Sequence, residues 1–172
     1  MELAIGVLDW MSPLWTQTYY PLDLPPDWRA AYYANEYTCA GTSDLSLESI
    51  RQWGEDLPEN FALWLCPKKE IEMSRLTVLH RLLGRKLKGV IQPSFTPARM
   101  ENGLFIQPPW SLEAGIPAAV GVLDGRHRPE SETRAYLEAF SKAPGPSQRQ
   151  LLIEGDAVAV ERILAMKLAL EL

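Results

Sequence analysis

The chain has 172 residues and a formal net charge of −5. This length fits one domain that can bury a sizeable core, and a hydrophobic fraction of 47% argues against a disordered chain. Acidic and basic residues are interleaved along the whole sequence and form no basic stripe, so we expect no nucleic-acid partner.

The first half of the chain alternates short apolar segments, typical of buried parallel strands, with amphipathic helices. The predicted strands are Leu3–Leu8, Thr38–Gly41, Phe61–Leu65 and Val90–Ile91, the last of which Pro93 must end. The predicted helices run from Asp27, as N-cap, to about Glu36; over Leu47–Asp56, capped by Ser46; and over Met73–Leu83, ending at Gly84. The aromatic, proline-rich segment Trp15–Pro26 is predicted to be a loop.

The second half continues the alternation of strand and helix. Its predicted elements are the extended segment Leu104–Gln107, the strand Ala118–Leu123, the helix Glu130–Lys142, the strand Gln150–Glu154 and a helix from Asp156 to the C-terminus. Such alternation predicts an α/β fold whose parallel sheet is covered by helices, and we expect the sheet to be curled rather than flat. No glycine-rich turn follows the first strand and no Walker loop is present, which argues against dinucleotide or nucleoside triphosphate binding.

Cysteine usage and hydropathy predict a cytoplasmic protein. Cys39 and Cys66 each lie inside an apolar stretch, as small core residues do, and do not form a disulfide framework. The N-terminus lacks the pattern of a secretory signal, and no apolar stretch approaches the roughly 18 residues that span a bilayer. We therefore expect a reducing compartment and no membrane contact.

A set of short motifs resembles the YecE-like family, a TIM-barrel-like domain of unknown function. The motifs are Ile5-Gly6, Trp10, Trp15, Tyr20-Pro21, Leu24-Pro25, Tyr32-Tyr33-Ala34, Ser49 to Trp53, Leu57 to Phe61, Leu83 to Leu87 and Gln92-Pro93-Ser94-Phe95. The match covers roughly Leu3 to Phe95 and includes Asp124 to His127; beyond Arg128 it is architectural only. The resemblance implies parallel β/α repeats around a TIM-barrel-like sheet.

The departures from the family pattern concern charged residues and length. Ala40 and Thr42 stand where family members usually carry a Glu and an Asn on the second strand, and Cys66 replaces a usual lysine. A full barrel takes roughly 250 residues, so this chain is expected to form an incomplete barrel of about six β/α units. Asp124, Arg126 and His127 are retained.

The first candidate site is the turn Asp124-Gly125-Arg126-His127, directly after the predicted strand Ala118–Leu123. Polar groups at the carboxyl ends of parallel strands commonly form the sites of α/β proteins. Arg126 is expected to bind a carboxylate or phosphate, with His127 as general acid or base and Asp124 as the group that orients it. Alternatively, these side chains form an internal salt bridge that stabilises the turn.

Asp9 and Trp10 end the first strand and would lie at the same edge of a parallel sheet. They are expected to hold a polar ligand against an aromatic ring; in the alternative, Asp9 caps a turn and Trp10 fills the core. Gln92, part of a family motif, completes the predicted ligand-binding set. The segment Asn102–Trp110 is either a lid over this edge or a short strand whose Trp110 plugs the barrel end.

No metal or other cofactor is predicted. With only two histidines in the chain, a multi-histidine site is excluded. An oxygen-rich site for a divalent cation, built from Asp9, Asp44, His127 and Glu154 at four strand ends, remains the weaker alternative.

The final helix is apolar on nearly all sides, which is typical of a buried helix. Its apolar residues include Val158, Val160, Ile163, Leu164, Met166, Leu168, Leu170 and Leu172. An incomplete barrel would also leave unpaired strand edges. We therefore expect a homodimer in which this helix or an exposed strand edge contacts the symmetry mate.

Two functional hypotheses follow. The chain is either a catalytically reduced barrel that binds a small, anionic ligand or another protein, or a small α/β enzyme of hydrolase or isomerase type that acts on an anionic metabolite. The missing second-strand carboxylate favours the first, and the retained turn at Asp124 favours the second.

Overall fold

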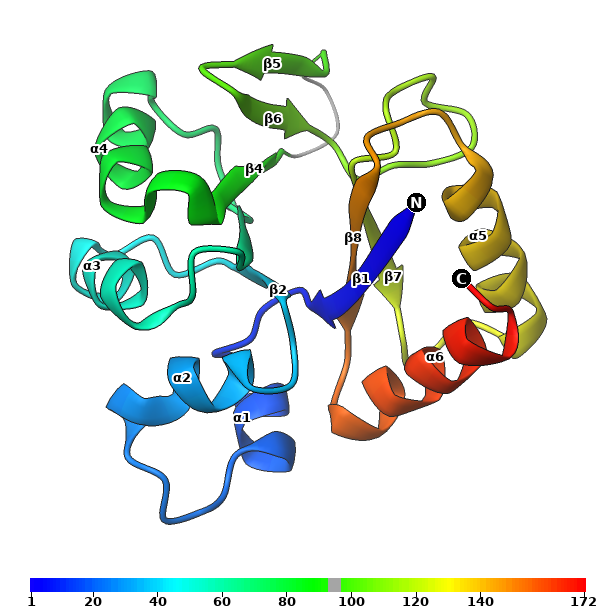
Figure 1. Ribbon diagram of the computed structural model, residues 1–172, viewed down its shortest axis with the longest axis horizontal. Coiled ribbons are helices and arrows are strands. Elements are labelled where there is room, and N and C mark those ends of the chain that lie inside the picture. The colour runs from blue at the N-terminus through cyan, green and yellow to red at the C-terminus, as the bar shows by residue number, and fades with distance from the viewer. Residues whose placement is uncertain (93–96) are drawn as a thin grey trace.

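The computed structural model, which describes residues 1–92 and 97–172, has one curled sheet with helices on its outside (Figure 1). The strands are β1 (Glu2–Val7), β2 (Cys39–Thr42), β3 (Ala62–Leu65), β4 (Leu87–Ile91), β5 (Arg99–Glu101), β6 (Leu104–Gln107), β7 (Val120–Asp124) and β8 (Gln148–Glu154). Their order is β5-β6-β4-β3-β2-β1-β8-β7, and only β5 and β6 pair antiparallel. The predicted α/β class and the curled, mostly parallel sheet are confirmed.

The helices pack around the convex side of the sheet. They are α1 (Pro13–Tyr19), α2 (Arg29–Ala34), α3 (Leu47–Asp56), α4 (Met73–Leu83), α5 (Glu130–Lys142) and α6 (Ala157–Ala169), with short 3₁₀ turns η1 (Pro26–Trp28) and η2 (Gly84–Lys86). In Figure 1, α3 and α4 flank β2 to β4, whereas α5 and α6 flank β7, β8 and β1. No helix among the described residues is long and apolar enough to cross a membrane.

Two apolar clusters occupy the two faces of the sheet. Alternate strand residues point outward beneath the helices and form the larger cluster. The concave face is lined by a smaller cluster that includes Cys39, Trp64 and Leu152. Trp64 is fully buried there, and its indole Nε1 donates to Oε1 of Gln150 at 3.2 Å. The inside of the curl is therefore packed with side chains.

The sheet is a half-barrel with edges at β5 and β7, and no ladder pairs β6 with β7 among the described residues. The connecting segment joins them: Gln107 Nε2 donates to the Pro117 carbonyl at 3.2 Å, and Trp110 N donates to the Val120 carbonyl at 2.9 Å. From α5, the Tyr136 hydroxyl donates to the Trp110 carbonyl at 3.0 Å. We call this junction of the 107–120 segment, β7 and α5 the seam. Trp110 is buried in it, as the plug alternative expects, rather than forming an open lid.

Several predicted elements are confirmed in detail. Ser46 caps α3 by accepting from Ser49 N at 3.4 Å, and Asp156 caps α6 by accepting from Ala159 N at 2.9 Å. Gly84 follows α4 with φ +57°, a conformation that favours glycine. The helix α5 has the predicted bounds.

Three predictions are wrong. The segment predicted as a loop from Trp15 contains α1, which Ser12 caps and Pro13 begins. Asp27 caps no helix, because the chain first forms η1 and then enters α2 through Trp28, which is itself exposed. The helix α6 is not buried all round: Val160, Ile163 and Met166 are buried, whereas Val158 and Leu168 are exposed. The predicted strand end at Pro93 lies outside the described residues.

Candidate functional site

The carboxyl ends of three neighbouring parallel strands bring acidic residues to one edge of the sheet. β8 pairs with both β1 and β7, with Val7 opposite Ile153 and Asp124 opposite Glu154. Asp9 follows β1 within two residues. Carboxylates from the first strand and from the last two therefore lie along one edge of the sheet, although 145 positions separate Asp9 from Glu154 in the chain (154 minus 9).

A cleft of about 280 Å³ opens between the ends of β1 and β8, and we call it the rim cleft. Its polar side chains are Asp9, Ser12 and Glu154, and Gly155 forms part of its wall. Oδ2 of Asp9 accepts a hydrogen bond from Ser43 Oγ at 2.7 Å, which fixes the carboxylate at the end of β1. Two carboxylates and a hydroxyl give this cleft mainly acceptor atoms, which suit a ligand with amino or hydroxyl donors.

Asp124 closes the turn that follows β7. Its Oδ1 accepts from the backbone N–H groups of Arg126 at 2.8 Å and His127 at 3.2 Å, and its Oδ2 lies 2.9 Å from Nδ1 of His127. The backbone donor of Arg126 and the His127 side chain lower the pKa of the Asp124 carboxyl to about 2. An ionised Asp124 accepts hydrogen bonds only, so a neutral His127 carries its proton on Nδ1 and leaves Nε2 as the proton acceptor.

Solvent surrounds much of this pair: the His127 side chain is 74% exposed. Arg126 is exposed as well, and none of the ion pairs within residues 1–92 and 97–172 includes it. A Cβ added to Gly155 would lie 3.7 Å from Arg126 Cγ, so the stem of Arg126 runs beside the wall of the rim cleft. The structure thus brings Arg126 next to Gly155 and joins Asp124 to His127 through the turn.

Trp10 lies in the core instead of at the rim. Its ring is fully buried and contacts Tyr33, Trp53 and Phe61, at centroid distances of 5.1, 5.2 and 5.7 Å. This burial agrees with the alternative in which Trp10 fills the core and gives no support to its predicted role as a ligand contact.

Gln92 is also remote from the rim cleft. It follows β4, which three strand pairings separate from β1, and its backbone N–H donates to the Gln107 carbonyl at 2.9 Å. Its side chain is buried, and Oε1 finds no hydrogen-bond donor among the described residues. Ser94 and Phe95 of the same motif lie outside the described residues.

The alternative cation site does not assemble from its four residues. Within the described part of the chain, no three His, Cys, Asp or Glu side chains are grouped so that they could hold a metal ion. Asp44 accepts from Ser46 N at 2.9 Å and from Ser49 Oγ at 2.7 Å. Partial burial opposes ionisation of Asp44, but these hydrogen bonds outweigh it and lower the pKa. Asp44 therefore acts as a turn residue ahead of α3.

Sequence reasoning missed Ser12, Ser43 and a second cleft. Ser43 reaches Asp9 across 34 positions of sequence, a contact that no local pattern signals. The second cleft, of about 830 Å³, lies at the seam and is lined mainly by apolar side chains such as Trp110, Ile116 and Pro144. We call it the seam cleft. The prolines and Trp110 were visible in sequence as a rigid segment, but their meeting with the end of α5 depends on the fold.

The chain matches no protein-family model, and a search of curated proteins finds no match. Among solved structures, it is similar to the crystal structure of a DUF72 family protein (EF0366) from Enterococcus faecalis V583, with a TM-score of 0.58 and 12% sequence identity. The likeness covers 99% of this chain and 98% of that chain. At this identity it shows a shared fold alone.

Proposed function

We propose that this protein is a small-ligand-binding module on a reduced TIM-barrel-like scaffold of the YecE-like type, and that its ligand occupies the rim cleft. The observation that carries the proposal is the convergence of Asp9 and Glu154 in one cleft at the carboxyl ends of β1 and β8. Parallel α/β sheets commonly bind ligands at this edge. DUF72 is related to YecE, so the structural neighbour is consistent with such a scaffold.

The chemistry of the cleft defines the ligand class. Asp9 and Glu154 attract amino or hydroxyl donors and disfavour a purely anionic molecule, whereas Arg126, beside Gly155, supplies a positive charge for a carboxylate or phosphate. A volume of about 280 Å³ limits the ligand to a small metabolite. We therefore propose a small polar molecule that carries both an anionic group and an amino or hydroxyl donor.

The second strand supports binding rather than catalysis. Ala40 and Thr42, at the positions where the resemblance implies Glu and Asn, are both fully buried. Thr42 Oγ1 accepts from Asp44 N at 3.1 Å and thus belongs to the turn before α3. These residues offer no carboxylate to a reacting group.

Thermal-shift screening with amino acids, hydroxy acids and small phosphate esters tests the proposal. A ligand at about 100 times its Kd stabilises a protein by about 2.7 kcal/mol, which for a domain of this size raises Tm by roughly 5–10 °C. Asp9→Asn and Glu154→Gln should each reduce the shift, whereas Glu48→Gln, an exposed acid on α3, should not. A shift that survives the Asp9→Asn, Glu154→Gln double variant would refute the rim cleft as the site.

A second candidate function, an enzyme acting on an anionic metabolite, is favoured by the 2.9 Å contact between Asp124 and His127. Here His127 would act as general acid or base, Asp124 would orient it, and Arg126 would hold the anionic group. Loss of a general acid or base typically lowers the rate by roughly 100- to 10,000-fold. For a metabolite that is turned over, His127→Ala should produce such a loss and His80→Ala should not; equal rates would exclude this function.

We also propose that the protein is a cytoplasmic homodimer. The free cysteines Cys39 and Cys66 are consistent with a reducing compartment. Val158 and Leu168 on α6 expose apolar surface that a symmetry mate would cover. Light scattering should give the mass of a dimer at micromolar concentration, and a Val158→Asp, Leu168→Asp variant should give that of a monomer. A monomer mass for the unmodified chain would overturn this arrangement.

A further inference from the structure

The seam cleft lies at the opposite end of the sheet from the rim cleft. Pro117 and Gly145 in its wall precede β7 and β8 respectively, so the cleft is near the amino ends of these strands. Its volume, about 830 Å³, falls in the range of roughly 300–1,000 Å³ that is usual for small-molecule sites. Any ligand here would be bound independently of Asp9 and Glu154.

The walls of the seam cleft offer apolar contact and few hydrogen bonds. The backbone donors of Trp110, Ala118 and Ala143 are already paired, with the carbonyls of Val120, Pro144 and Ala139. Pro117, Pro144 and Pro146 have no N–H to donate. An extended peptide that binds by adding a strand needs free backbone groups, so this surface suits an apolar chain better than a peptide.

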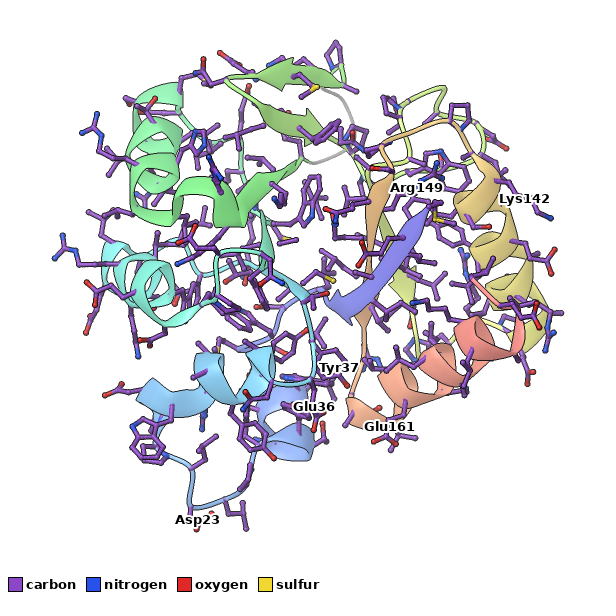
Figure 2. All side chains as sticks on the ribbon, in the orientation of Figure 1. Asp23, Glu36, Tyr37, Lys142, Arg149 and Glu161 are labelled. Atoms are coloured by element: carbon purple, nitrogen blue, oxygen red, sulfur yellow. The ribbon has the colours of Figure 1, made fainter. Side chains whose placement is uncertain are left out.

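One charged side chain, Lys142, lies among the residues that line this cleft. It extends from the end of α5 on the outside of the molecule (Figure 2). Its Nζ is 3.9 Å from Glu138 Oε2, and the Lys142 side chain is 76% exposed. Such an exposed ion pair is weak, so Lys142 can turn toward a ligand anion at little cost.

The guanidinium of Arg149 is buried against the end of α5, where it neutralises carbonyl groups that would otherwise repel an anion. Arg149, on β8 near the end of α5 (Figure 2), donates through Nη1 to the carbonyls of Phe140 at 2.5 Å and Ser141 at 3.2 Å. The C-terminal end of a helix carries partial negative charge on its last carbonyls. Because Arg149 neutralises these carbonyls from the inside, the outer surface beside Lys142 is left favourable to a negative group.

We propose that the seam cleft binds a medium-chain acyl carboxylate, with the hydrocarbon chain against Trp110, Ile116 and Pro144 and the carboxylate at Lys142. The apolar walls select the chain, and the single ammonium group selects the negative head. Leu112, an exposed residue of the lining, would cover part of the bound chain.

Isothermal titration calorimetry with octanoate, decanoate and decan-1-ol, each below its aggregation concentration, tests chain and head separately. Each buried methylene increases affinity about fourfold, so decanoate, with two more methylenes, should bind about sixteenfold more tightly than octanoate. Decanoate should also bind more tightly than decan-1-ol. Lys142→Glu should abolish the preference for the carboxylate, whereas Lys69→Glu, at another exposed lysine, should preserve it.

A variant that fills part of the seam cleft tests whether the hydrocarbon chain binds there. Ala139→Leu on α5 should weaken decanoate binding without changing the circular dichroism spectrum, whereas Asp9→Asn at the rim cleft should leave that binding unchanged. Equal affinity for octanoate and decanoate, absence of binding, or an unchanged preference in Lys142→Glu would overturn the proposal. A concentration-dependent dimer that Leu112→Asp dissociates, with no decanoate binding, would overturn it too, because the surface would then contact a second copy of the chain.

Discussion

Replacement of Trp10 by alanine should greatly destabilise the fold without acting through the rim cleft. The indole is fully buried between Tyr33, Trp53 and Phe61, beneath the end of β1. A buried tryptophan removes about 150–250 Å² from water, which at about 25 cal/mol per Å² is worth roughly 4–6 kcal/mol. Alanine keeps part of this contribution, so we expect the free energy of unfolding to fall by about 4 kcal/mol, within the usual range of about 3–5 kcal/mol.

Phenylalanine at the same position should cost much less. Nε1 of Trp10 has no hydrogen-bond acceptor among the described residues, and a buried unpaired donor typically costs about 1–3 kcal/mol. Trp10→Phe loses ring area but also removes this unpaired donor. The two effects partly cancel, and we expect a loss of about 1–2 kcal/mol.

Urea unfolding followed by far-ultraviolet circular dichroism measures both variants. Domains of this kind have about 5–15 kcal/mol of total stability, so a loss of this size can unfold Trp10→Ala. Trp10→Leu is therefore measured beside it as the milder variant. A loss below about 1 kcal/mol for Trp10→Ala would refute the placement of the ring in the core. Loss of ligand binding by a stably folded Trp10→Phe would instead support the role that the sequence predicts.

Three further predictions concern titration and packing. The pKa of Asp124 is about 2 with both donors present, and in His127→Ala it should rise but stay below the ordinary value, because the Arg126 amide still donates. Carboxyl NMR titration measures this pKa. An unchanged pKa in the variant would show that His127 does not interact with Asp124. Stability contributed by Asp124 is present above its unfolded pKa of about 3.9 and is lost as pH falls through about 2. Burial raises the pKa of the Cys39 and Cys66 thiols to about 12, so both should resist a thiol reagent at pH 8 until the chain unfolds. The free energy of unfolding should also decline as pH rises above the unfolded thiol pKa of about 8.5. Rapid labelling of the native protein would contradict this burial. Gly89→Ala would put a Cβ 2.1 Å from the Phe105 carbonyl oxygen and 2.6 Å from the Trp64 ring, and urea unfolding should show a loss of about 1–3 kcal/mol or more; a neutral result would mean that β4 and β6 lie farther apart.

Elements whose signals are local could be predicted from the sequence. Ser46 and Asp156 supply side-chain caps, and Gly84 supplies a left-handed residue after α4, so the starts of α3 and α6 and the end of α4 followed from neighbouring residues. The aromatic residues around Trp15 instead predicted a loop, whereas the structure forms α1 there. Their packing against Tyr19, Tyr33 and Tyr37 stabilises α1 despite poor helix propensity, and this packing was invisible in the local pattern.

The edge of the sheet on which polar residues gather was predictable, but their partners along that edge were not. Parallel strands put Asp9, Asp124 and Glu154 at their carboxyl ends whatever the strand order. The order decides which of them meet: β8 lies between β1 and β7, so Asp9 and Glu154 share the rim cleft, while β2 and β3 separate β4 from β1. Gln92 is excluded from the cleft for that reason and not because of its chemistry. A pattern read along the chain does not reveal this strand order, because β1, at the start of the chain, pairs with β8, which lies near its end.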